Sequence, residues 1–144
     1  MPFFSKTSRD RLATCEQDLQ IVFNAVIRLY DCTIVEGERS EERQKELVKT
    51  GKSKTMKSKH LFRPSKAVDA VPWPFDYDKL NKGDKDTWNQ FYHFVGFVMG
   101  VASGLGIKLR SGADWNQNYD IKDETFRDLF HFELITEDSQ PDYL

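Results

Sequence analysis

The sequence has 144 residues, of which 39% are hydrophobic and 13% aromatic, and its formal net charge is −2. These values are typical of one globular domain over residues 1–144, and they exclude a disordered or generally basic, nucleic-acid-binding chain. No apolar stretch approaches the ~20 residues that span a bilayer, so we expect no stable membrane insertion. Residues 1–11 lack the segments of a signal peptide, which predicts synthesis and storage in the cytoplasm.

Apolar residues recur at steps of three and four over residues 8–30, which predicts one amphipathic helix. Cys15 lies on its apolar stripe, and we expect it to be a small core residue. Cys15 and Cys32 form neither a disulfide framework nor a Cys-x-x-Cys pair, which favours a reducing compartment. A β-rich run over residues 32–36, followed by Gly37, predicts the first strand.

A second helix is expected to begin after Ser40, a capping residue followed by two acidic residues, and to end at Gly51. Residues 43–66 then carry almost only positive charge. Such a stretch is typical of a solvated face, and the alternative is a surface that attracts an anionic polymer such as cell-wall material. Nucleic acid fits less well, because no aromatic residues are interleaved with the charges.

The second strand is predicted over residues 67–71, with Asp69 on one face and prolines at the end. Residues 73–84 are expected to form a loop. The next helix has a heavy apolar face and is expected to begin at Asp86 or Thr87.

This helix is expected to extend to Gly104 or Gly106. His93 lies on it among aromatic residues, which favours a structural or surface role over contact with a substrate.

Residues 107–110 predict a third strand, residues 111–127 a long polar loop, and residues 131–135 the last strand. An acidic tail, residues 136–144, is expected to be frayed and flexible. The order of these elements favours an α+β fold with a small, mainly antiparallel sheet and helices packed on it.

Two histidines and one aspartate form a candidate metal site, although they are far apart in the chain. His60 and Asp69 flank a short turn, and His131 follows much later. Two imidazoles and a carboxylate suit catalytic zinc, with the fourth position left to water. Asp128, three residues before His131, could take the proton from that water. The alternative is a pair of unrelated histidines.

These residues resemble the motifs of the D-Ala-D-Ala metallopeptidase (VanY-like) family, which includes phage endolysins that cut the L-alanyl-D-glutamate bond of peptidoglycan. That family carries Ser-x-His-x-x-Gly-x-Ala-x-Asp and, near the C-terminus, an acid-x-x-His followed by an apolar-Glu-Leu run. The matching residues here are Ser58, His60, Ala67, Asp69, Asp128, His131, Glu133 and Leu134. Two further stretches match the family, residues 34–44 around Arg39 and residues 107–115.

The resemblance implies a Hedgehog/D-Ala-D-Ala-peptidase-like fold and one zinc ion, with three ligands, His60, Asp69 and His131. It also implies Asp128 as general base and Arg39 as an electrophilic group near the substrate carbonyl or carboxylate. The alternative for Arg39 is an exposed charge at the helix entry. Ser58 is expected to orient its loop or bind substrate, and Glu133 to orient a ligand imidazole.

The resemblance further implies a phage endolysin, a monomeric hydrolase held in the host cytoplasm until it is released to the cell wall for host lysis. The alternatives are a D,D-carboxypeptidase, a D-Ala-D-Ala dipeptidase, or a zinc-stabilised cell-wall-binding module without activity. The chain departs from the family motif, because it has two more residues between His60 and Asp69 and Ser65 where the family has Gly. We expect these extra residues to bulge outward and to change the pocket rim.

One further pattern resembles the start of a calcium-binding loop, with oxygen-bearing side chains at alternate positions. Its members are Asp114, Asn116, Asn118 and Asp120. Tyr119 stands where such a loop needs Gly, and Thr125 where it needs a bidentate Glu. An ordinary polar loop is therefore the first expectation, and a Ca²⁺ site the alternative.

Overall fold

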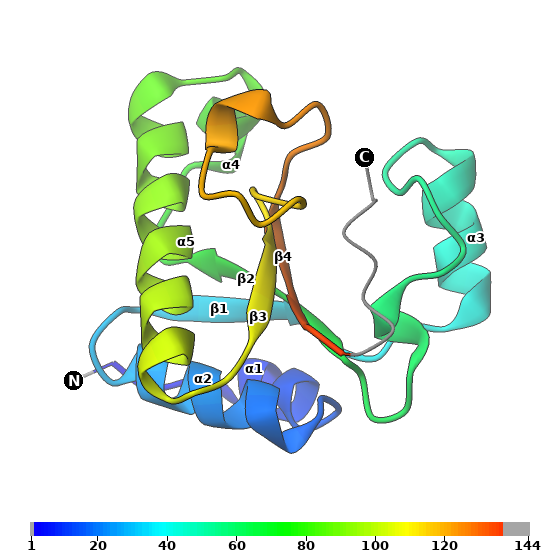
Figure 1. Ribbon diagram of the computed structural model, residues 1–144, viewed down its shortest axis with the longest axis horizontal. Coiled ribbons are helices and arrows are strands. Elements are labelled where there is room, and N and C mark those ends of the chain that lie inside the picture. Colours follow the sequence, from blue (N-terminus) through cyan, green and yellow to red (C-terminus); the bar gives the residue numbers. More distant parts are fainter. Residues whose placement is uncertain (1, 137–144) are drawn as a thin grey trace.

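The computed structural model describes residues 2–136, arranged as Figure 1 shows. In chain order the elements are α1 (Lys6–Leu12), α2 (Gln17–Ile27), β1 (Cys32–Glu36), α3 (Glu41–Lys49), the 3-10 helix η1 (Lys59–Leu61), β2 (Ala67–Pro72), α4 (Tyr77–Asn81), α5 (Lys85–Gly104), β3 (Leu109–Gly112), the 3-10 helix η2 (Ile121–Asp123) and β4 (Asp128–Leu134). This mixture of helices with a small sheet confirms the predicted α+β class. No helix within residues 2–136 is long and apolar enough to cross a membrane.

The four strands form one antiparallel sheet in the order β1-β2-β4-β3. The two central strands are therefore β2 and β4, and Asp69 of β2 stands directly opposite His131 of β4. Directly opposed residues of an antiparallel pair point to the same face of the sheet, with Cβ atoms about 4.5–5.5 Å apart. The register thus brings two of the three candidate ligands side by side.

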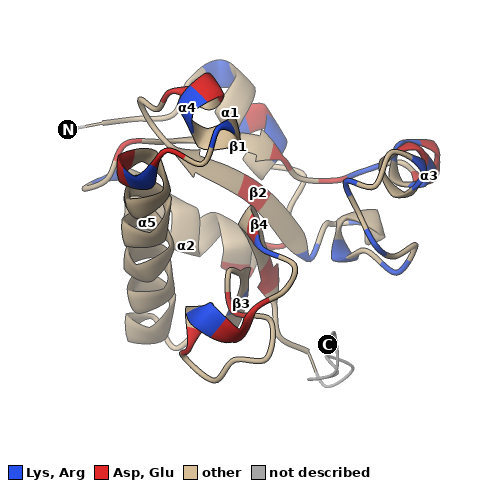
Figure 2. Cartoon of the chain, turned by 90° about the horizontal axis from the view of Figure 1, so that it is seen from above, with Lys and Arg blue, Asp and Glu red and all other residues tan. Residues whose placement is uncertain are grey.

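Helices α2 and α5 cover one face of this sheet and share its hydrophobic core. The ring of Phe132 in β4 contacts Phe23 of α2 and Phe94 of α5, with centroids 5.5 and 6.2 Å apart. Because consecutive residues of a strand point to opposite faces, His131 and Glu133 face away from these helices. In both views α3 lies across the strands from α5 (Figures 1 and 2), so the site lies on the side of α3.

The helix that we expected over residues 8–30 is two helices, and that prediction was wrong. The chain breaks between α1 and α2 because this segment pairs with Ser65, which is distant in the sequence. The Ser65 N–H donates to the Thr14 carbonyl at 2.9 Å, and its carbonyl accepts from the Glu16 N–H at 2.8 Å. Cys15 is buried at this break, in agreement with its expected place in the core.

Smaller differences concern the ends of the elements. The predicted loop at residues 73–84 contains α4, and the N-cap of α5 is Asp84, whose carboxylate accepts from the Thr87 N–H at 3.0 Å. The third strand lies two residues further along than expected, and β4 begins at Asp128 instead of at residue 131. The expected tail at residues 136–144 lies, apart from its first residue, outside the described residues.

Candidate metal centre

The candidate ligands come from three elements that meet on the α3 side of the sheet. His60 lies in η1, whose N-cap Ser58 accepts from the His60 backbone N–H through its hydroxyl at 3.2 Å. Asp69 and His131 lie on the two central strands. One ligand atom from each of these three side chains lies within 4.8 Å of the others. Asp69 Oδ1 is 3.2 Å from His60 Nε2 and 3.4 Å from His131 Nδ1.

Hydrogen bonds on the outer ring nitrogens fix the tautomers of both histidines. His60 Nδ1 donates to the Gly37 carbonyl at 2.7 Å, which leaves Nε2 as the lone-pair nitrogen facing Asp69. His131 Nε2 donates to Glu133 Oε1 at 2.9 Å, which leaves Nδ1 facing the same carboxylate. A metal ligand imidazole usually needs such a partner on its other nitrogen. Burial lowers the pKa of His131, but its bonds to Asp69 and Glu133 outweigh burial and raise the pKa to about 10, so a metal ion must displace the Nδ1 proton. Once it does, the triad can present two neutral imidazoles and one carboxylate oxygen.

Glu133 is itself held by two buried cations. Its Oε2 lies 2.8 Å from Arg110 Nη2 and 3.2 Å from Lys59 Nζ, and all three side chains are at least nine-tenths buried. Burial alone would raise the pKa of Glu133, but the bond to His131 and the charge of Arg110 outweigh it and lower the pKa to about 2. The carboxylate thus stays ionised and keeps accepting the His131 proton.

Arg39 is close to the centre, but most of its donors are already engaged. Its Nε and Nη2 donate to the two oxygens of Glu36 at 3.0 and 2.9 Å, and Nη1 donates to Gln44 Oε1 at 2.7 Å. Nη2 also lies 3.2 Å from Asp69 Oδ2, the oxygen that faces away from the two histidines. This geometry favours a role for Arg39 in orienting the Asp69 carboxylate, in addition to the electrophilic role that the sequence suggested.

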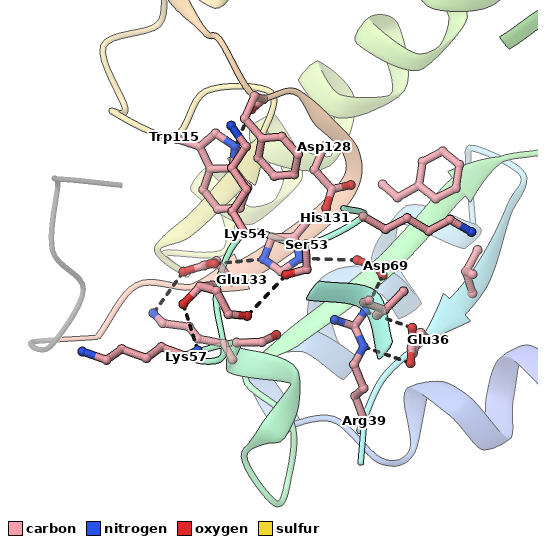
Figure 3. Close-up of a pocket in the computed structure, with 18 of the residues that line it drawn as sticks. Glu36, Arg39, Ser53, Lys54, Lys57, Asp69, Trp115, Asp128, His131 and Glu133 are labelled. Carbon is pink, nitrogen blue, oxygen red and sulfur yellow. Dashed lines mark hydrogen bonds and ion pairs between the residues drawn. The ribbon is translucent and has the colours of Figure 1, made fainter. Parts of the chain in front are cut away.

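A cavity of about 690 Å³ opens beside the triad, and Asp69, His131 and Asp128 all line it. Figure 3 shows Asp128 next to His131 at this cavity. Burial raises the pKa of Asp128, although the nearby His131 opposes the change. The ring of Trp115 covers His131 with centroids 5.3 Å apart, and its Nε1 donates to the Phe126 carbonyl at 2.8 Å. The arrangement brings a candidate metal position, a carboxyl group that could transfer a proton and a cavity together in one place.

The basic stretch of the sequence lies along one wall of this cavity. Five of its residues, on α3 and in the segment after it, line the cavity: Arg43, Lys52, Lys54, Lys57 and Lys59. Figure 2 shows the basic positions along the chain that leaves α3. Part of the stretch therefore faces the cavity.

Two other sequence features lie away from the cavity. The enlarged turn at residues 62–64 projects outward as expected, with Phe62 and Arg63 exposed, and it does not line the cavity. The expected change at the pocket rim relative to the family stays a prediction. His93 is exposed on α5, where its Nδ1 lies 2.9 Å from the Tyr30 hydroxyl.

The residues of the suspected calcium loop lie between β3 and η2. Their side-chain oxygens accept hydrogen bonds from backbone N–H groups of the loop itself. The Asp114 carboxylate, for example, accepts from the N–H groups of Asn118 and Tyr119 at 3.3 and 2.9 Å. These hydrogen bonds explain the alternating polar side chains, which stabilise the turns of the loop. Calcium binding stays a prediction.

Sequence reasoning gave no role to four residues that support the site: Gln44, Lys59, Arg110 and Trp115. Gln44 is fully buried, accepts from Arg39, and donates to the Thr55 carbonyl at 2.7 Å, which ties α3 to the following loop. The sequence feature that could have indicated a role for Lys59 at the site is its position next to His60. Arg110 gave only a weak signal, a charged residue in a short strand.

Comparison with known proteins places the chain in a family. The family model of the phage L-alanyl-D-glutamate peptidases matches residues 1–135. The L-alanyl-D-glutamate peptidase of Escherichia phage T5 is 34% identical over 143 residues, covering 92% of this chain and 97% of that protein. The crystal structure of the Serratia marcescens L-Ala D-Glu endopeptidase ChiX matches with a TM-score of 0.68 and 28% identity, over 92% of this chain and 89% of that one. The chain therefore belongs to the phage L-alanyl-D-glutamate peptidase family, which confirms the predicted peptidase.

Proposed function

We propose that this protein is a zinc-dependent endolysin that hydrolyses the L-alanyl-D-glutamate bond in the stem peptides of peptidoglycan. The observation that carries the proposal is the meeting of His60 Nε2, His131 Nδ1 and Asp69 Oδ1 beside one cavity. Two nitrogens and one oxygen suit borderline zinc, and three protein ligands leave a position open for water. Membership of the family supports the choice of bond.

The residues of the chain divide the chemistry between them. Zinc, when bound, supplies a Lewis acid that lowers the pKa of water toward about 7. Asp128 accepts the proton of the attacking water and later gives it to the amine nitrogen that leaves. A pKa raised by burial suits this double role, because the carboxyl is a stronger base than an exposed one. Glu133 and Arg39 hold His131 and Asp69 in place.

We further propose that the protein is stored in the host cytoplasm and acts on the cell wall as a monomer during lysis. The phage origin of the family and of its T5 member supports a role in lysis. Release would then depend on another factor that opens the membrane.

The test combines metal content with product analysis on purified peptidoglycan. Wild-type protein should contain one zinc ion per chain and should generate new N-terminal D-glutamate and C-terminal L-alanine. His131→Ala should lose both zinc and cleavage, whereas the matched control His93→Ala should keep both, because His93 lies outside the cavity. New termini at D-alanine would favour a carboxypeptidase or dipeptidase, and bound zinc without cleavage would favour a wall-binding module.

A further inference from the structure

Arg43 occupies a distinctive place beside the metal centre. It lies on α3 and lines the cavity. Its Nε donates to Glu36 Oε1 at 2.9 Å, and Glu36 is in turn bound by Arg39, which contacts the ligand Asp69. This chain of ion pairs holds the Arg43 guanidinium near the metal ligands, although 57% of its side chain is exposed.

Within the part of the chain that the structure describes, the outer end of this guanidinium has no hydrogen-bond partner. Neither Nη1 nor Nη2 of Arg43 makes a hydrogen bond to any residue between 2 and 136, so up to four N–H donors are available. Lys52 and Lys57, which line the same cavity, form no ion pair within the described residues. The wall along α3 thus carries two lysines that form no ion pair within residues 2–136, and an arginine whose pairing with Glu36 leaves its outer N–H donors open.

The bond named by the family has an anion on one side only. A glutamate residue carries two carboxyl groups, and chain continuation can use only one of them. Unless that second carboxyl is amidated, the leaving side of an L-alanyl-D-glutamate bond is therefore negative, whereas the alanine side chain is uncharged. Arginine presents paired N–H donors that match a carboxylate, and such charge-assisted bonds give geometric specificity.

We propose that Arg43 binds the free carboxylate of the D-glutamate residue and so selects and orients the substrate. Lys52 and Lys57 add positive potential along the same wall. The D-glutamate side then lies toward α3, and the alanyl side lies toward Tyr77 and Phe130, uncharged residues that line the cavity from elsewhere. Figures 1 and 2 place α4, which carries Tyr77, across the strands from α3. This inference rests on the proposed function and specifies its substrate recognition.

Two peptides test it, each with one L-alanyl-D-glutamate bond and differing only in whether the free D-glutamate carboxyl is a carboxylate or a primary amide. Wild-type enzyme should cleave the carboxylate peptide with a kcat/KM about tenfold higher, the scale of a charge-assisted bond at a partly exposed site. Arg43→Gln should lose about that factor on the carboxylate peptide and keep the wild-type rate on the amide. Arg43→Lys keeps the charge but loses the paired N–H donors of the guanidinium. Its kcat/KM on the carboxylate peptide should lie between the values of wild type and Arg43→Gln.

Lys45→Gln is the matched control, because Lys45 lies on the same helix, is exposed and does not line the cavity. It should behave as wild type on both peptides. Equal slowing of both peptides by Arg43→Gln, or a wild-type enzyme that does not distinguish them, would overturn the assignment of Arg43. A wild-type enzyme that cleaves neither peptide would overturn the proposed function itself. Zinc content, measured on each variant, shows whether the neighbouring Asp69 has been disturbed.

Discussion

The two histidines of the candidate metal centre are held by partners of different kinds. His60 Nδ1 donates to a backbone carbonyl, that of Gly37, which remains whatever side chain is substituted nearby. His131 Nε2 donates to the side chain of Glu133, whose charge is balanced by Arg110 and Lys59. The orientation of His131 therefore depends on a buried ionic cluster, and a single substitution can disturb it.

Glu133→Gln should weaken the site without touching a ligand. The amide can still accept the His131 proton, but Arg110 and Lys59 lose their anion in a buried place. We expect a loss of about 3–5 kcal/mol in unfolding free energy and a 10- to 100-fold weaker zinc affinity. Urea denaturation and chelator competition measure these two quantities. Glu38→Gln removes only the surface pair with Arg63, 3.4 Å long, and should change stability by less than about 1 kcal/mol.

Asp128→Asn separates acid–base chemistry from metal binding. The amide keeps the shape of Asp128 but cannot accept a proton, so kcat should fall by about 10²–10⁴ while one zinc ion per chain remains. Peptide hydrolysis kinetics and metal analysis on the same preparation provide the test. Asp86→Asn, an exposed acid at the start of α5, serves as the control and should leave kcat unchanged. A near-normal rate in the Asp128 variant would remove this residue from catalysis.

At the scale of elements, sequence patterns predicted the helix ends that depend on contacts between neighbouring residues. The Ser40 cap of α3 and the Gly51 stop were both expected, and the structure has the Ser40 hydroxyl accepting from the Arg43 N–H and Gly51 at a φ of 77°. The break between α1 and α2 was not predictable in this way. The apolar spacing continues through Cys15, and only pairing with the distant Ser65 shows that the helix is interrupted.

The close approach of β3 to β4 offers a test at the same scale. Gly112 pairs with Asp128 at a register shift, where an added Cβ would meet the Asp128 carbonyl and lie 2.9 Å from its Cβ. Gly112→Ala should therefore displace Asp128, with about 10²-fold lower kcat and about 1–3 kcal/mol lower stability.

Gly96→Ala is the matched control in α5, because nothing lies within 4 Å of an added Cβ there. It should keep the wild-type rate and raise helix stability by up to about 1 kcal/mol. Kinetics and urea denaturation of the two variants give the comparison. Equal behaviour of both glycine variants would show that β3 and β4 can separate without moving the carboxylate of Asp128.

At the scale of the whole molecule, the sequence could indicate the ligand set but not its surroundings. His60, Asp69 and His131 were recognisable from residue type and motif, and the structure brings them together. Arg110 and Lys59 were not assigned, because a charge in a sequence gives no sign that it will be buried against a distant carboxylate. Those pairings exist only once η1, β3 and β4, which carry Lys59, Arg110 and Glu133, are folded together.

Because the three candidate ligands come from η1, β2 and β4, a metal ion bound to them should stabilise the whole fold. An ion that binds only the native state adds about 2.7 kcal/mol at a concentration 100 times its Kd. For a domain of this size that is a rise in Tm of about 5–10 °C. Calorimetry of chelated and zinc-loaded protein measures it, and His60→Ala should show no rise. A chelated protein with unchanged Tm and full activity would contradict a metal centre made of these side chains.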